Sequence, residues 1–297
     1  MQKPSDTPSS TDRMHRFVFE NFDIRGQTVQ LTRAHLDIVD IHQYPPGVCQ
    51  LMGEFLAAVV LLSGTLKFEG KVILQARSEA QVPLLMVECS NDLEVRAIAR
   101  GAQEATATEF EQLLGGGQLA ITIDPLEGQR YQGIVPLDGH SLAASLEHYF
   151  EQSEQLATRF WLAADDHGAA GMLLQQLPEK LTTVPEHRHN NWAHICSLAN
   201  TVEGSELLQL ATPQLLHRLF HEDPLRLFEP TPVKFQCSCS AERSQNALLA
   251  LGVEDLESLL EERGEISIDC EFCNQQYLFA RDDLTQALGA DKPSTVH

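Results

Sequence analysis

The chain has 297 residues, of which 43% are hydrophobic and 21% charged, a composition typical of a soluble globular protein with about two domains. Its formal net charge of -21, from 42 acidic and 21 basic side chains, argues against nucleic acid and anionic membranes as default partners. No apolar run reaches the roughly 18 residues of a membrane span, and the polar residues 1–15 predict a disordered tail rather than a signal peptide. We therefore expect a cytoplasmic protein, whose paired cysteines serve metal binding or redox chemistry more often than structural disulfides.

Residues 16–178 predict an α+β domain, because runs of strands with only a few helices favour a mainly antiparallel sheet covered by helices. The apolar run 51–62 (LMGEFLAAVVLL), which ends at Gly64, is too short to cross a bilayer and predicts a central buried helix. Other helices are expected at 35–42, at 109–114 and from the N-cap Ser141 to about 153. Strands are expected at 17–22 and 28–32 around a turn at Gly26, and at 71–77, 82–89, 93–100, 118–123, 130–135, 158–163 and 170–177.

Residues 179–230 predict a helical linker of marginal stability, since short helices are weak unless they pack on something. The helical patterns cover 192–200, 205–210 and a helix with Thr212 as N-cap and Pro213 in its first turn. The face of that last helix is apolar, with Leu215, Leu216, Leu219 and Phe220. Five histidines in the linker are interpreted as parts of solvated helix faces, because no acidic or cysteine partner has recognisable ligand spacing: His187, His189, His194, His217 and His221.

Four cysteines dominate residues 231–297. Cys237 and Cys239 form a C-x-C pair, and Cys270 and Cys273 form a C-x-x-C pair after a spacer of thirty residues. Two close thiol pairs joined by a folded spacer are the ligand set of a tetrahedral, all-cysteine zinc site. We therefore expect a small C-terminal module that binds one Zn²⁺ per chain. The other cysteines lie apart from one another beside apolar residues, and we interpret them as buried small hydrophobes: Cys49, Cys89 and Cys196.

The size of this module suggests that the metal controls its folding. A segment of 67 residues has one apolar core, which contributes only a few kcal/mol of net stability. A structural zinc contributes on the order of 10–16 kcal/mol of apparent binding energy in small fingers, most of it expressed as folding. Oxidation of the thiolates would remove the ligands, so we expect an oxidant to expel zinc, unfold the module and loosen the linker. Newly exposed apolar faces would then bind other apolar surfaces.

The cysteine spacing resembles that of the redox-regulated heat-shock holdases, the 33 kDa chaperonin family of bacteria. Further similar stretches are MGEFLAA (52–58), EGQRYQG (127–133), SEQLATR (153–159), LLHRLFHED (215–223) and GEISIDCEFC (264–273), so that the resemblance runs from about Phe17 to the end. The polar N-terminal extension and the three additional cysteines are departures from the family's pattern.

This resemblance implies an ATP-independent chaperone that is inactive while it is reduced and binds zinc through Cys237, Cys239, Cys270 and Cys273. It also implies that oxidation forms the disulfides Cys237–Cys239 and Cys270–Cys273, releases zinc and unfolds the redox module. The active form is expected to hold unfolding client proteins, often as a homodimer.

Two other functions fit parts of the pattern. A zinc-ribbon nucleic-acid-binding protein would need a basic surface, whereas residues 231–297 carry five basic against twelve acidic side chains. A thiol oxidoreductase would place its C-x-x-C at the start of a helix after a strand, whereas Cys270 and Cys273 lie in a predicted hairpin beside Asp269 and Glu271. No constellation of catalytic side chains has supporting context, so we do not expect an enzyme.

Overall fold

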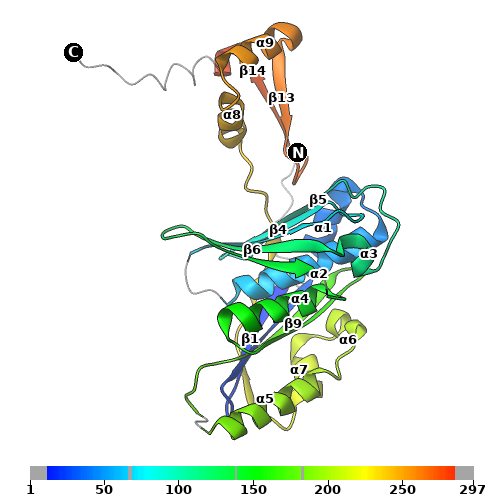
Figure 1. The fold of residues 1–297 in the computed structure, drawn as a ribbon, viewed down its shortest axis with the longest axis vertical. Helices are drawn as coiled ribbons and strands as arrows, with labels where there is room; N and C mark the ends of the chain where they lie inside the picture. Colours follow the sequence, from blue (N-terminus) through cyan, green and yellow to red (C-terminus); the bar gives the residue numbers. More distant parts are fainter. Residues whose placement is uncertain (1–11, 66–68, 138, 182–183, 285–297) are drawn as a thin grey trace, which may run out of the picture. The chain divides into compact units, whose positions relative to one another are not determined.

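The computed structural model describes residues 12–65, 69–137, 139–181 and 184–284 (Figure 1). The chain forms two compact units, Met1–Gln236 and Cys237–His297, which we call the N-terminal unit and the C-terminal unit. Each mixes helices and strands, and the α+β class predicted from the sequence is confirmed.

The first sheet of the N-terminal unit is antiparallel, and its strand order brings the two ends of that unit together. Strand β1 lies next to one edge and pairs with β2, with β10 and with the short β11. The strands follow one another in the order β10 (Leu225–Leu227), β1 (Arg13–Phe19), β2 (Ile24–Leu31), β9 (Ala169–Gln176) and β8 (Thr158–Ala164), and β11 spans Thr231–Pro232.

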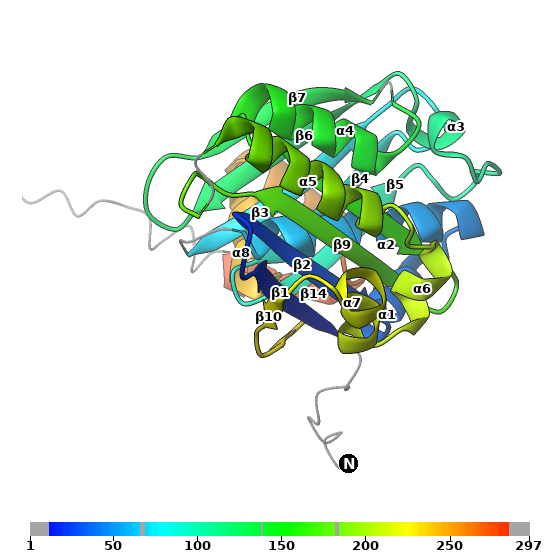
Figure 2. The ribbon, with the colours of Figure 1, turned by 90° about the horizontal axis from the view of Figure 1, so that it is seen from below.

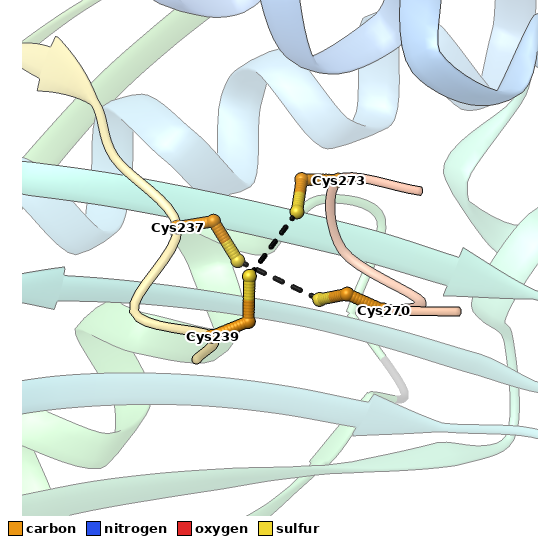
Figure 3. Close-up of side chains that lie close together, drawn as sticks. All are labelled: Cys237, Cys239, Cys270 and Cys273. Atoms are coloured by element: carbon orange, nitrogen blue, oxygen red, sulfur yellow. Dashed lines mark hydrogen bonds between the residues drawn. The ribbon is translucent and has the colours of Figure 1, made fainter. Parts of the chain in front are cut away.

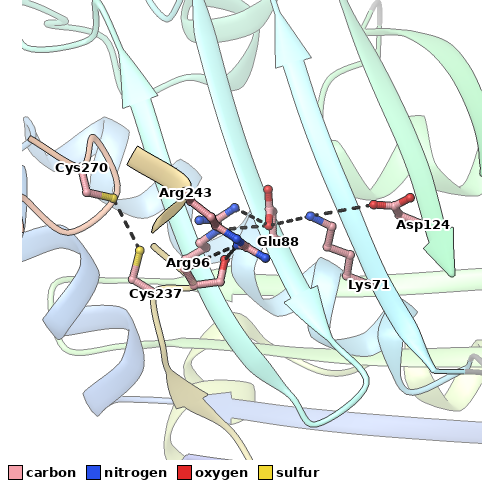
Figure 4. Close-up of polar contacts among 8 residues, drawn as sticks. Lys71, Glu88, Arg96, Asp124, Cys237, Arg243 and Cys270 are labelled. Atoms are coloured by element: carbon pink, nitrogen blue, oxygen red, sulfur yellow. Dashed lines mark hydrogen bonds and ion pairs between the residues drawn. The ribbon is translucent and has the colours of Figure 1, made fainter. Parts of the chain in front are cut away.

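The second sheet is antiparallel except at one edge, where β12 runs parallel to β5. On this sheet the buried Glu88 accepts hydrogen bonds from Arg96 Nε and Nη2 at 3.0 and 2.8 Å, and Lys71 Nζ lies 3.5 Å from the same carboxylate (Figure 4). These cross-strand ion pairs fix neighbouring strands in register. The order is β12 (Lys234–Phe235), β5 (Glu94–Arg100), β4 (Leu84–Ser90), β3 (Gly70–Arg77), β6 (Gly117–Pro125) and β7 (Tyr131–Leu137).

Helix α2 (Pro46–Ser63) lies between the two sheets and contacts strands of both (Figure 1). It begins five residues before the predicted start, because Pro46 and Gly47 form its first turn, and it ends before Gly64 as predicted. Its 18 residues are long and apolar enough to cross a membrane, yet 78% of them are buried inside the unit. Around it lie α1 (Arg33–His42), α3 (Phe110–Leu114), α4 (Leu142–Tyr149), which Ser141 caps, and the π-helical turn η1 (Phe150–Glu154).

The linker helices cover the other face of the first sheet, where α5 (Pro185–Ala199), α6 (Gly204–Gln209) and α7 (Thr212–Phe220) lie over β9, β2 and β1 (Figure 2). Strand β9 is therefore apolar on both faces. Leu173 joins the core around α2, while its neighbours Met172 and Leu174 join a second core with the helices. Helix α5 begins earlier than the predicted 192, since Pro185 occupies its first turn. The linker thus has a substantial buried interface within the N-terminal unit.

Two predicted details at β2 and α7 are wrong. Gly26 lies inside β2 rather than in a turn, because a Cβ there would lie only 2.1 Å from the Phe17 ring that packs across it. Thr212 is the first residue of α7 rather than its N-cap, and its hydroxyl lies 3.0 Å from that of Thr28 in β2, so its side chain holds the helix on the sheet.

The start of β1 lies inside the segment predicted as a tail. Residues 1–11 are outside the described part of the chain, but Asp12 is buried and its carboxylate accepts hydrogen bonds from the backbone N–H groups of Arg33 and Ala34 at 3.0 and 2.6 Å. An acceptor at these positions satisfies donors that the first turn of α1 leaves free. Asp12 thereby attaches β1 to α1.

The C-terminal unit contains α8 (Ala241–Leu249), α9 (Val253–Arg263) and a hairpin of β13 (Glu265–Asp269) and β14 (Gln276–Ala280). It starts at Cys237, later than the predicted boundary at 231, because β11 and β12 pair with strands of the N-terminal unit. Gly264 ends α9 with a φ of 78°, which favours glycine. The core has six buried side chains: Leu248, Leu256, Leu260, Ile266, Phe279 and Leu284.

Candidate metal centre and redox site

The structure brings together all four cysteines that the sequence analysis selected. Cys237 and Cys239 lie in the segment before α8, and Cys270 and Cys273 lie in the turn that joins β13 to β14 (Figure 3). Their four Sγ atoms lie within 4.8 Å of one another, and among the described residues they form the one such group of three or more potential metal ligands. The thiols point toward a common centre (Figure 3).

Local backbone structure positions each pair. In the hairpin turn, the N–H of Cys270 donates to the carbonyl of Gln275 at 2.9 Å, and the N–H of Asn274 donates to the carbonyl of Cys270 at 2.7 Å. Asn274 has a φ of 55°, a left-handed conformation that asparagine tolerates better than most residues. This tight turn directs Cys270 and Cys273 to the same side.

The C-x-C segment is held by the first turn of α8. The Ser240 hydroxyl caps that helix by accepting from the N–H of Arg243 at 3.2 Å. Arg243 Nη1 in turn donates to the carbonyl of Ser238 at 2.7 Å and to its hydroxyl at 3.1 Å (Figure 4). The guanidinium therefore fixes the residue between Cys237 and Cys239, which explains how so tight a spacing can present both thiols.

The sulfur separations fit a tetrahedral metal. Cys237 Sγ lies 3.6 Å from Cys270 Sγ, and Cys239 Sγ lies 3.4 Å from Cys273 Sγ. A disulfide bond would require about 2.05 Å, so the four thiols are reduced. Four sulfurs at about 2.3 Å from a central zinc would lie about 3.8 Å apart, close to the separations here. The four soft donors thus suit a thiophilic metal ion.

Tyr277 is a further member of the site. Its hydroxyl donates to Cys239 Sγ at 3.2 Å. Burial acts to raise the pKa of Cys239, but the Tyr277 hydroxyl and the neighbouring thiols outweigh it and lower this pKa to about 7. The same hydrogen bond raises the pKa of Tyr277 to about 12. Cys239 therefore ionises near neutral pH when no metal is bound.

The other two thiols with perturbed pKa values remain protonated at neutral pH. Burial raises the pKa of Cys237, against the effect of a backbone hydrogen bond from Cys239. Burial and the adjacent thiols also raise the pKa of Cys273. Of these three shifted thiols, only Cys239 is thus favoured as a thiolate in the metal-free cluster. A bound cation would change this balance, since it stabilises every coordinating thiolate.

The remaining cysteines lie in the N-terminal unit, away from any metal-ligating cluster. Burial raises the pKa of Cys89 to about 12 and that of Cys196 to about 11. It also raises the pKa of Cys49, whose thiol donates to the carbonyl of Tyr44 at 3.3 Å. Cys89 is therefore a buried small hydrophobe as predicted, whereas Cys49 and Cys196 are only half-buried.

The linker histidines belong to no metal cluster within the described residues. His194 Nε2 lies 3.0 Å from Asp223 Oδ2, and the rings of His217 and His221 lie 5.8 Å apart. No sequence motif indicated the contacts of Tyr277 and Arg243 with the C-x-C segment. Tyr277 lies opposite Ile268, two residues before Cys270, so the hairpin register was the one available signal for a contact with the thiols.

The sequence model of a family described as Hsp33 protein matches residues 12–280. The chain belongs to the Hsp33 family. It is 53% identical over 290 residues to the 33 kDa chaperonin of Pseudomonas syringae pv. syringae, covering 95% of this chain and 96% of the relative. The 33 kDa chaperonin of Pseudomonas paraeruginosa is 52% identical over 294 residues, covering 97% and 99% of the two chains.

A solved structure has the same fold. The crystal structure of the 33 kDa chaperonin from Thermotoga maritima superposes with a TM-score of 0.79 at 20% identity, over 95% of this chain and 100% of the other. Membership in the Hsp33 family makes the chain a redox-regulated holdase chaperone, as the resemblance in sequence implied.

Proposed function

We propose that Cys237, Cys239, Cys270 and Cys273 hold one Zn²⁺ in the reduced chain, and that the chain is inactive as a holdase in this state. The observation that carries the proposal is the gathering of the four Sγ atoms within 4.8 Å. Zinc is favoured over harder cations because all four donors are sulfur. When bound, the ion would supply a cross-link between the C-x-C segment and the β13–β14 turn.

The fold of the C-terminal unit supports its dependence on that cross-link. In the described part of the unit, six buried side chains form its core and a few half-buried ones pack against them. A core of this size supplies at most about 3–5 kcal/mol. A structural zinc contributes on the order of 10–16 kcal/mol of apparent binding energy, most of it expressed as folding, so we expect the unit to unfold once its thiols release the metal. The hairpin and the segment before α8 are joined at the site by side-chain contacts among the cysteines and by Tyr277.

Oxidation would form the disulfides Cys237–Cys239 and Cys270–Cys273. Each bond forms as two thiols lose two protons and pass two electrons to an oxidant such as hypochlorite or peroxide, which is thereby reduced. In the folded site the shortest separations instead join Cys237 to Cys270 and Cys239 to Cys273. The sequential pairs are favoured once the unit loosens, because partners one or two residues apart stay within reach in an unfolded chain.

Unfolding of the C-terminal unit would then spread along residues 179–230, the predicted linker domain. The chain before Cys237 is attached to the N-terminal unit through β12 and β11, of two residues each, and β10, of three. Pairings this short are weak. Release of α5–α7 would uncover the apolar face of β1, β2 and β9 that they bury. An exposed apolar sheet would bind the apolar segments of unfolding client proteins.

In this proposal the Hsp33 chain acts in the cytoplasm, needs no ATP and catalyses no reaction. Its partners are unfolding client proteins and, in the oxidised form, a second copy of the chain. The surface uncovered beneath α5–α7 would serve either contact. Nucleic acid and membranes are not partners, because a chain with a net charge of -21 repels polyanionic surfaces.

The experiment that tests the proposal combines three readouts on one sample. The reduced, zinc-loaded chain is treated with hypochlorite at mildly raised temperature, and zinc release, far-UV circular dichroism and suppression of client aggregation are followed together. We expect one zinc per chain to leave as helix content falls and holdase activity appears, with peptide mapping showing the two sequential disulfides. Zinc release without loss of helix content and without gain of holdase activity would contradict the proposed switch and indicate a purely structural metal site.

A further inference from the structure

A cavity of about 140 Å³ lies between the two sheets of the N-terminal unit, with Arg25 of β2 in its wall. Side chains from both sheets, from α2 and from η1 form the rest of the wall, and Gln175 and Tyr149 add polar groups. Most of the wall is apolar: Leu62, Val72, Ile121, Ile123, Phe150 and Leu156. An apolar cavity with one cation and few other polar groups has the composition of a small-molecule site.

A second cavity, of about 300 Å³, shares Arg25 and Thr65 with the first. It adds a second cation, Arg16, and the aromatic ring of Phe228. Gln27 also lines it, is only 1% exposed, and has no hydrogen-bond partner for its side-chain Oε1 among the described residues. Rotation of this amide by half a turn would present its N–H donors in place of the unsatisfied oxygen.

Arg25 has an unusual set of partners for a partly buried cation. Its Nε and Nη2 donate to Gln175 Oε1 at 3.1 and 2.6 Å, and Gln175 Nε2 donates in turn to the Thr158 hydroxyl at 3.0 Å. The neutral amide is its one hydrogen-bonding partner in the described part of the chain, where no carboxylate pairs with it. Burial lowers the pKa of Arg25 from its usual value, and no acidic neighbour opposes that effect.

An arginine in this position is a natural ligand for an anion. A guanidinium that loses water without gaining a counter-ion destabilises the folded chain, and an added carboxylate would remove that penalty. Its Nε and Nη2 already donate to Gln175, so Nη1 is the nitrogen that can donate to a ligand. Arginine pairs with carboxylates through short, charge-assisted hydrogen bonds. No acidic side chain in the described part of the chain pairs with Arg25, so the carboxylate of a ligand can take that position.

We propose that Arg25 and the two cavities beside it form a binding site for an amphiphilic carboxylate, an apolar chain that ends in a single carboxyl group. The carboxylate pairs with Arg25, and the chain lies against Leu62, Ile121 and Leu156. A small hydrophilic anion such as phosphate would leave these apolar side chains uncovered, so the wall selects against it. The site is separate from the cysteine cluster and belongs to the folded N-terminal unit, so it does not depend on the proposed zinc switch.

Octanoate is the probe that tests the site, by equilibrium dialysis and thermal denaturation of the reduced full-length chain. We expect one octanoate per chain and a higher thermal midpoint for the N-terminal unit, because a ligand that binds only the folded state stabilises it. Octanol, which lacks the charge, and acetate, which lacks the chain, should each bind at least about tenfold more weakly. An acetylated leucine tripeptide with a free or an amidated C-terminus tells whether peptide carboxylates also enter.

Two variants of Arg25 test whether its guanidinium is required for octanoate binding. Arg25→Met should weaken octanoate at least about tenfold, whereas Arg25→Lys, which keeps the charge, should retain part of the affinity. The matched control Arg130→Met removes an exposed cation and should bind octanoate as the parent does. Equal octanoate affinity in Arg25→Met and the parent, or no binding to the parent, would overturn the proposal. Circular dichroism of each variant checks that it is folded.

Discussion

Replacement of Cys273 by serine removes one of the four sulfur donors and leaves the size of the side chain almost unchanged. Apparent binding of a structural zinc by four ligands is worth on the order of 10–16 kcal/mol, or roughly 2.5–4 kcal/mol for each. Loss of one ligand should therefore weaken metal affinity by about two to three orders of magnitude. Six buried side chains form the core of the described part of the C-terminal unit, which supplies at most about 3–5 kcal/mol, so the loss of one ligand is about as large as the whole folding reserve.

The assay for Cys273→Ser is a comparison without oxidant. We expect the variant to be purified with little zinc, to lack the far-UV signal of α8 and α9, and to suppress client aggregation before any oxidation. The matched control is Cys196→Ser, which removes a thiol of the N-terminal unit outside the cluster and should keep the redox switch. A Cys273→Ser chain that stays folded and inactive until it is oxidised would refute the reasoning.

Three further predictions concern thiol reactivity and the linker. Tyr277→Phe removes the hydrogen bond to Cys239 and should raise its pKa above about 7, so that alkylation of the metal-free chain at pH 7 slows and its pH profile moves upward. Leu219→Ala leaves a cavity beneath α7 and should lower the free energy of unfolding by about 2–5 kcal/mol in urea titration, with holdase activity at lower oxidant concentration. Cys89 and Cys196, whose pKa values burial raises to about 12 and 11, should resist alkylation at pH 7 in the folded chain, as peptide mass spectrometry would show.

Each of these predictions has an internal control. Tyr131→Phe removes a hydroxyl from the N-terminal unit and should leave the Cys239 profile unchanged. Gln214→Ala changes an exposed side chain of the same helix as Leu219 and should alter stability by less than about 0.5 kcal/mol. In guanidinium chloride Cys89 and Cys196 should alkylate readily. An unshifted Cys239 profile, an unchanged urea midpoint or rapid native alkylation would contradict the corresponding prediction.

The gathering of the four thiols was predictable from sequence because the cysteines come in two close pairs whose spacing itself limits where the thiols can point. The structure brings Cys237, Cys239, Cys270 and Cys273 together. Tyr277 was not, since its contact with Cys239 depends on the register of the hairpin and on the way the two segments meet. Local sequence patterns identify the clustered cysteines, but they do not identify the neighbouring groups, such as Tyr277, that shift the pKa values of those cysteines.

The fold shows the same division. The apolar run of α2 predicted the central buried helix, whereas the division of the strands into two sheets on either side of it depends on pairings between distant segments. Gly26 was taken for a turn because glycine serves both turns and close packing. The pairing of Arg25 with Gln175 joins residues 150 positions apart, and no local signal could have indicated it. Likewise, β11 and β12 were assigned to the C-terminal module, although their pairing partners β1 and β5 lie in the first hundred residues.

Hydrogen exchange of the zinc-loaded chain, before and after hypochlorite, tests most directly whether metal and thiols keep the C-terminal unit folded. We predict that amides of α9 and of the β13–β14 hairpin are protected in the reduced chain and exchange within seconds after oxidation, while those of α2 stay protected in both states. Unchanged protection of the hairpin after complete zinc release and disulfide formation would contradict the account.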